Sequence, residues 1–167
     1  MSDCACVQCT NEPVPGNQCP PNPPVLLHYF TEIIINHNLV IPEQKPDVED
    51  IIAVHKNFAV HDFETIDVNL GDTTGRKVVL AGTLELGFEY SAAVPSQEVH
   101  FAHFCIPFQA IIKFRPCEIN RGLLPPDFDI TQYNVRFCVE HEQYHVISPR
   151  EISKVLVVLI WLEPITP

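Results

Sequence analysis

The chain has 167 residues, of which 46% are hydrophobic, as is typical of one globular domain with a substantial core. Its formal net charge of −11 argues against a nucleic-acid partner, which needs clustered Lys and Arg, and against binding to an anionic membrane surface. No apolar run is long enough to span a bilayer and no basic residues precede an early apolar run, so we expect neither a membrane protein nor a secretory signal peptide.

Residues 1–24 are rich in proline and cysteine and contain almost no large apolar side chains. Such a segment adds little to a core, and its prolines favour an extended chain that is partly polyproline II. We therefore expect a connector arm over residues 1–24, followed by a folded domain over residues 25–167.

The domain is rich in β-branched and aromatic residues, separated by turns that contain Gly and Pro. Pro46 and the acidic residues after it are compatible with a single short helix near residues 47–52. The pattern predicts strands over 25–41 (one strand or two), 53–70, 76–94, 98–114, 132–147 and 151–163.

Several of these segments alternate between apolar and polar residues. Leu84, Leu86, Phe88 and Tyr90 alternate with Thr83, Glu85 and Glu89; Tyr133, Val135, Phe137 and Val139 alternate with Asn134, Arg136, Cys138 and Glu140. A period of two places each set on one face of a strand, so the fold class that we predict is all-β, an antiparallel β-sandwich.

The segment His141–Glu142–Gln143–Tyr144–His145 matches the His-Glu-x-x-His pattern of zinc peptidases, which requires a helix. The alternation that precedes it indicates a strand instead. On a strand, His141 and His145 would share a face but lie about 13 Å apart, too far to share one zinc ion. We therefore do not expect a protease.

The other polar candidates have simpler explanations. His100 and His103 would point to opposite faces of their strand. Asp47, Glu49 and Asp50 lack the spacing of a calcium loop and suit the first turn of a helix. We find no catalytic set, so we expect no enzyme, no cofactor, no metal and no small-molecule substrate.

The seven cysteines are the most informative feature of the sequence. Cys4, Cys6, Cys9 and Cys19 allow three readings: a four-thiolate zinc site, incidental thiols in a flexible tail, or disulfides that join subunits. We favour the disulfides, because an odd number of cysteines leaves at least one for another chain. Cys117 follows a strand and Cys138 lies on the polar face of its strand, so both are candidates for exposed partners; Cys105 is either buried or paired.

Four blocks of the domain resemble the SPOCS domain of spore coat and spore-envelope proteins of Firmicutes. They are residues 41–54, 75–90, 99–108 and 144–162, and the segments PDVEDII and IPF are the most specific. The resemblance covers roughly residues 33–163. The chain lacks the peptidoglycan-binding LysM module of many relatives, and its cysteine-rich arm is similar in layout to that of endospore appendage subunits.

The resemblance implies a structural protein of the spore surface, in the coat, the exosporium or an appendage, made in the mother cell without a signal peptide. We expect a head-to-tail homo-oligomer, a fibre or lattice in which the arm of one subunit is disulfide-bonded to the next. Other spore coat proteins are further candidate partners. The alternative is a morphogenesis adaptor that recruits coat proteins without polymerising, and a hydrolase with an unrecognised site is a third hypothesis.

Overall fold

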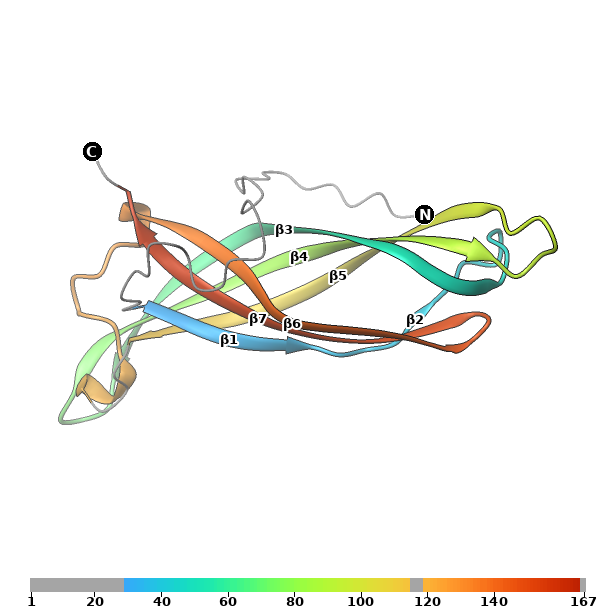
Figure 1. Cartoon of the computed structure of the whole chain (residues 1–167). Helices are drawn as coiled ribbons and strands as arrows, with labels where there is room; N and C mark the ends of the chain where they lie inside the picture. Colours follow the sequence, from blue (N-terminus) through green and yellow to red (C-terminus); the bar gives the residue numbers. More distant parts are fainter. Residues whose placement is uncertain (1–28, 115–118, 166–167) are drawn as a thin grey trace.

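The structure is a computed structural model that describes residues 29–114 and 119–165. Within these residues the chain forms long antiparallel strands and two short 3₁₀ turns, η1 (Ile119–Gly122) and η2 (Ile130–Gln132) (Figure 1). The strands are β1 (Tyr29–Ile35), β2 (Leu39–Val40), β3 (Val48–Asn69), β4 (Thr74–Ala92), β5 (Val99–Phe114), β6 (Tyr133–Ser148) and β7 (Glu151–Pro164). The predicted all-β class and antiparallel pairing are confirmed.

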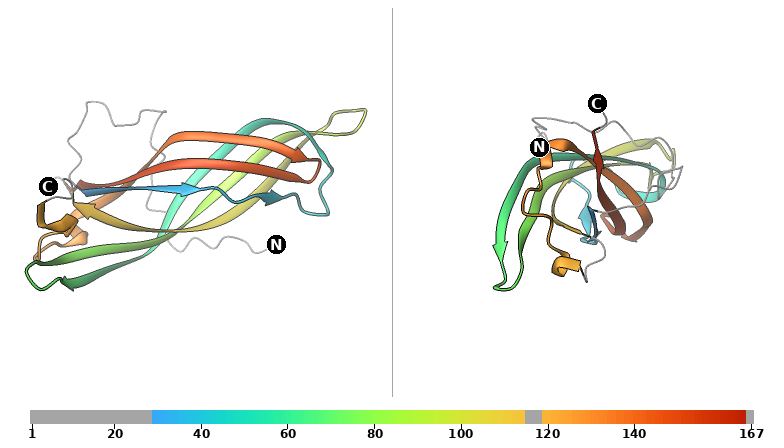
Figure 2. Two further views of the ribbon diagram at one scale, coloured as in Figure 1. Left: turned by 90° about the horizontal axis from the view of Figure 1, so that it is seen from below. Right: turned by 90° about the vertical axis from the view of Figure 1, so that its left-hand side faces the viewer.

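The strands form two layers. In the first layer, which we call sheet A, β7 pairs with β6 along one side and with β1 and β2 along the other. In the second layer, sheet B, β4 lies between β3 and β5. A short pairing of β1 with β5, at Tyr29–Phe114 and Phe30–Lys113, joins the two sheets at one end. Figure 2 shows the layers packed face to face, with the tip of the β3–β4 hairpin projecting from the body.

The opposite side of the sandwich is closed by side chains. β3 and β6 are the edge strands of their sheets, and they approach each other without forming a ladder. The rings of Phe58 and Phe137 stack there with centroids 4.9 Å apart, and Lys56 forms an ion pair with Glu142. We call this contact between the two edges the seam.

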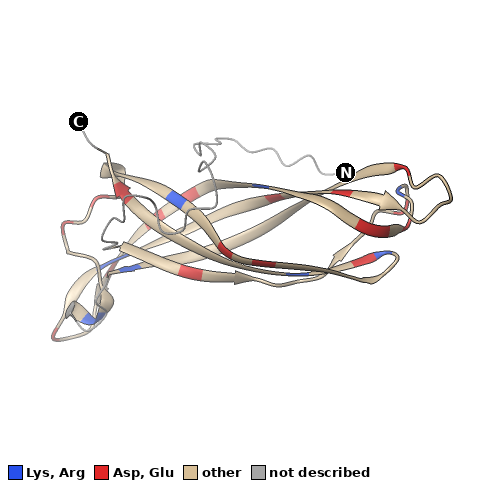
Figure 3. Ribbon diagram, in the orientation of Figure 1, with Lys and Arg blue, Asp and Glu red and all other residues tan. Residues whose placement is uncertain are grey.

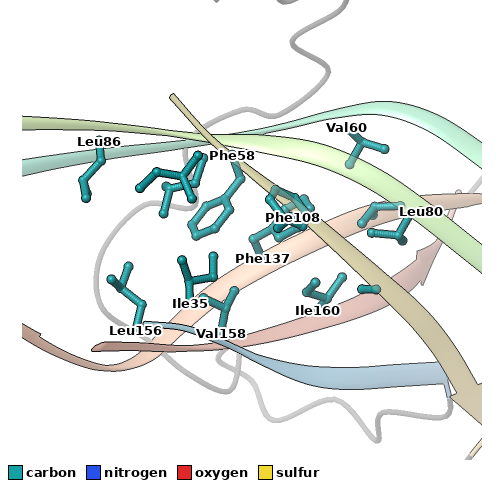
Figure 4. Close-up of a cluster of buried hydrophobic side chains, with 14 of the residues drawn as sticks. Ile35, Phe58, Val60, Leu80, Leu86, Phe108, Phe137, Leu156, Val158 and Ile160 are labelled. Atoms are coloured by element: carbon teal, nitrogen blue, oxygen red, sulfur yellow. The ribbon is translucent and has the colours of Figure 1, made fainter. Parts of the chain in front are cut away.

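The core fills the space between the sheets, and Figure 4 shows its central part. Leu84, Leu86, Phe88 and Tyr90 are fully buried, as their alternation predicts. Val135 and Phe137 of β6 face them from sheet A, together with alternate residues of β7. Gly82 is required in this region, because a Cβ atom there would collide with the backbone oxygen of Ala59 and with the ring of Phe108.

The short helix that the sequence allows near residues 47–52 does not form; these residues belong to β3, apart from Asp47. A β-bulge between Val48 and Asp50 inserts one residue, so Val48 opposite Ala92 and Ile51 opposite Tyr90 both face the core. β3 also starts with a backbone hydrogen bond from Val48 N to Pro149 O, which fixes an extended entry.

Candidate functional site

Five of the seven candidate cysteines lie outside the described residues: Cys4, Cys6, Cys9, Cys19 and Cys117. The predicted connector arm over residues 1–24 lies there too. The described residues contain Cys105 and Cys138, and both are disulfide-bonded. Neither is therefore a free thiol.

Cys138 lies on the face of β6 that points away from the main core, as the alternation predicts, but it is buried rather than exposed. It forms a small second cluster with Leu159 and Trp161 of β7, and Phe30 of β1 packs against this cluster. The prediction of an accessible thiol is wrong because the neighbouring strand presents large apolar side chains on this outer face. With its sulfur already bonded, Cys138 could join a second subunit only by exchanging that bond.

Cys105 has the opposite environment. It occupies an outward-facing position on β5, opposite Glu85 of β4, and its side chain is exposed. The sequence left a buried or a paired cysteine open here, and the structure has it paired. Cys105 and Cys138 therefore belong to the outer faces of the two different sheets.

The His-Glu-x-x-His segment lies on β6, as predicted. His141 stands opposite Val157 and His145 opposite Ser153, and both side chains are exposed on the outer face of sheet A. In the part of the chain that the structure describes, no group of three or more His, Cys, Asp or Glu side chains is arranged to hold a metal ion.

His100 and His103 point to opposite faces of β5, as predicted. His100 packs against the ring of Tyr90, with centroids 6.0 Å apart, and its Nε2 lies 3.7 Å from Glu98 Oε2. His103 is exposed on the outer face of sheet B, in the same cross-strand row as Gly87 and His55. Phe101 leans over Gly87 in this row, where a Cβ atom would collide with its ring.

The acidic residues near position 48 do not cap a helix. Asp47 accepts a hydrogen bond from Arg150 Nη1 at 3.0 Å, and Glu49 accepts one from Gln97 at 2.7 Å. The Arg150 guanidinium also donates to the backbone oxygens of Ile41 and Pro42. Arg150 thus fastens the β2–β3 connection to the β6–β7 turn, and these polar residues have a structural role.

The polar groups at the seam were not singled out by the sequence patterns. Lys56 Nζ lies 2.6 Å from Glu142 Oε2, and the Tyr144 hydroxyl donates to the same oxygen at 3.1 Å. Burial of the ring raises the pKa of Tyr144, and the neighbouring Glu142 carboxylate raises it further. The hydroxyl therefore stays protonated and remains a hydrogen-bond donor at neutral pH.

Lys154 is the one buried polar or charged residue among those described, with 1% of its surface exposed. Its Nζ donates a hydrogen bond to the backbone oxygen of His37 at 2.6 Å, and burial lowers its pKa to about 8. At neutral pH a larger fraction of an amine with this pKa is unprotonated than of an ordinary lysine, but the Lys154 side chain is enclosed by the fold. A signal for it was present in the sequence, since Lys154 falls on the same parity as Ile152, Leu156 and Val158, which face the core.

Taken together, the described residues form a packed β-sandwich, and most of their polar and charged side chains lie on its outer faces. Acidic side chains are spread over its length and outnumber basic ones (Figure 3). No helix of the described residues is long and apolar enough to cross a membrane.

The family model described as SipL, SPOCS domain, matches residues 47–147 of the chain. This match runs from the residue before β3 through most of β6, so it includes sheet B and both strands of the seam. Searches of curated proteins and of solved structures find no match.

Proposed function

The chain belongs to the SipL SPOCS domain family, which indicates a spore-related role, and from this we propose that it is a structural subunit of the spore surface. In the proposal, subunits self-assemble head to tail into a fibre or an envelope lattice, and disulfide bonds lock each contact. A contact between two different surfaces that does not close on itself propagates in this way without limit. No catalytic step is part of the proposed role.

One observation carries the proposal: both cysteines of the described sandwich are disulfide-bonded, while the chain has seven cysteines in all. The protein thus uses its thiols for bonds, and an odd total leaves at least one cysteine that cannot pair within the same chain. A bond to a second chain satisfies it. Such a bond, once formed in an oxidising exterior, would persist through heat and denaturant.

The cysteines proposed for this link are those of the connector arm, Cys4, Cys6, Cys9 and Cys19, with Cys117 as a further candidate. The layout of a cysteine-bearing arm ahead of a β-sandwich is similar to that of endospore appendage subunits. Cys138 is a weaker candidate than the sequence implies, because it is buried and already bonded.

Denaturing gel electrophoresis with and without a strong reductant tests the proposal. We expect a ladder of multiples of 18.9 kDa that collapses to one band only on reduction, and filaments or sheets in electron micrographs of the unreduced sample. A variant with Ser at positions 4, 6, 9 and 19 should lose the ladder. The matched control is Ser2→Cys in this variant, which restores one thiol to the arm.

A single band in both lanes, together with a monomeric protein in solution, would contradict the polymer. Such a result would favour the adaptor, which should instead bind one spore coat protein in a discrete complex. Zinc in the purified protein, together with peptidase activity that Ala at position 141 abolishes, would favour the hydrolase.

A further inference from the structure

The second half of β3 is a sheet edge whose geometry suits the addition of another strand. Residues 62–69 pair with residues 74–81 of β4 in an uninterrupted antiparallel register, from Asp62–Ala81 to Asn69–Thr74. On the other side of β3, no strand of the described chain pairs with this stretch. Alternate backbone N–H and C=O groups of an edge strand point outward and can bind an added strand.

Two of the usual defences of an edge strand, bulges and proline, are missing from this stretch. β3 contains three bulges, but all of them precede Phe63, the last lying between Val60 and Asp62. β6, the other edge strand, is interrupted at Val139–His141 and again at Val146–Ser148. Bulges twist an edge away from pairing, and neither they nor proline interrupt residues 62–69.

Apolar side chains are exposed on both faces of the stretch. Phe63 lies opposite the fully buried Leu80 and therefore points to the core side, yet 42% of its surface is exposed. Ile66 points to the outer face, beside Lys77, and is 36% exposed. An added strand would cover both residues, which gives the pairing a hydrophobic component as well as backbone hydrogen bonds.

Charge decides which partner fits. Asp62 and Glu64 share the outer face of the edge, and neither has an ion-pair partner among the described residues. Asp67 farther along is held by Arg76 of β4 at 2.9 Å. In an antiparallel pair of two such edges centred near Phe63, Asp62 of one copy would stand opposite Glu64 of the other, and like charges across a strand pair are destabilising.

We propose that the free edge of β3 over residues 62–69 binds an extended, basic segment of another protein as an additional strand. Lys or Arg on one face of that segment would stand opposite Asp62 and Glu64, and apolar residues would cover Phe63 and Ile66. The acidic pair also disfavours pairing of the edge with its own copy in registers that bring the carboxylates together. This contact requires no disulfide, so it is independent of the proposed polymer.

Synthetic peptides provide the test on the full chain. The probe is a fluorescent nine-residue peptide with Lys at alternate positions and Val or Thr between them. We expect salt-sensitive binding by anisotropy, and slower amide hydrogen exchange confined to residues 62–69. Methylation of alternate backbone nitrogens of the peptide should abolish binding, because it removes the donors while keeping the charges.

Charge reversal provides the matched comparison. Asp62→Lys with Glu64→Lys should weaken binding of the Lys peptide by roughly tenfold or more, and should allow a Glu peptide of the same design to bind. Glu43→Lys with Glu98→Lys makes the same change in net charge at the other end of the molecule and should leave both affinities nearly unchanged.

Three outcomes would overturn the proposal. The first is no binding of the Lys peptide. The second is equal binding of the methylated and unmethylated peptides, and the third is equal weakening of binding by the two charge-reversal variants. Either of these two results would mean that the peptide is attracted only by the net charge of −11 of the protein.

Discussion

The two halves of β3 differ in what lies beside their outer edge. From Val48 to Val60 the strand is bulged, its core side is buried or half-buried, and Phe58 and Lys56 contact β6 across the seam. From Asp62 to Asn69 the strand is regular, and among the described residues no strand pairs with its outer edge. One continuous strand thus combines a half that closes the sandwich with a half that is available for binding.

This difference shows how a two-sheet fold can close without a continuous ladder. At the seam, a stacked ring pair and one ion pair take the place of backbone hydrogen bonds. The closing force is therefore packing, and it is concentrated at few positions. Substitutions at the seam should be costly, whereas equivalent substitutions at the free edge should be mild.

The largest expected effect is that of Phe58→Ala. Phe58 is buried and contacts both Phe137 and Phe108, so its truncation should lower the free energy of unfolding by about 3–5 kcal/mol. Phe63→Ala, on the same strand but at the open edge, should cost about 1 kcal/mol or less. Urea denaturation with the disulfides intact measures both, and equal losses would contradict the distinction between the two halves.

The second effect is a stabilisation, and it concerns Lys154, which pairs with Tyr144 of β6 on the core side. The pKa of Lys154 is 10.5 in the unfolded chain, and burial lowers it to about 8 in the folded protein. Below pH 8, burial of the charged amine therefore costs roughly 3 kcal/mol. Lys154→Met should raise the free energy of unfolding by about 1–3 kcal/mol at pH 7, after loss of the hydrogen bond to His37.

The pH dependence of this gain tests its cause. Between pH 8 and 10.5 the folded protein binds fewer protons at Lys154 than the unfolded chain, so the stability that this residue contributes rises with pH. The advantage of Lys154→Met should thus fall by about 2 kcal/mol between pH 7 and pH 9.5. Comparing the two proteins at each pH cancels the titration of the tyrosines. A constant difference would show that Met acts through packing alone.

The third effect is the ion pair of the seam. Lys56 and Glu142 are both partly exposed, so their interaction should contribute about 0.5–1 kcal/mol. A double-mutant cycle with Lys56→Met and Glu142→Gln isolates this value, and 1 M NaCl should reduce it. A coupling that does not change with salt would show that the two side chains interact through packing rather than charge.

The sequence predicts the sandwich well because period-two alternation reports directly which face of a strand is buried. The strands over 76–94, 98–114, 132–147 and 151–163 are each confirmed to within about two residues of their predicted ends. The errors have local causes. The acidic residues after Pro46 suggest the first turn of a helix, but Asp47 and Glu49 instead bind side chains of neighbouring turns. Leu159 and Trp161 turn a nominally polar face into a buried one around Cys138.

The seam could not be predicted in the same way. Alternation states which face of a strand is buried, but it contains no information about which edges meet in space. Lys56 and Glu142 are 86 positions apart, and only the twist of the two sheets brings them together. The cysteines of the arm lie outside the described residues, so their predicted role is still a prediction.

The charge-reversal variant of the β3 edge should have the smallest effect on stability, although it should have the largest effect on peptide binding. Asp62→Lys with Glu64→Lys changes two exposed side chains that have no ion-pair partner among the described residues, so the free energy of unfolding should change by no more than about 0.5 kcal/mol. Thermal denaturation monitored by circular dichroism measures this. A much larger loss would mean that the two carboxylates hold the second half of β3 in place. The edge would then serve the fold of this chain, and its acidic pair would have no need of a basic partner.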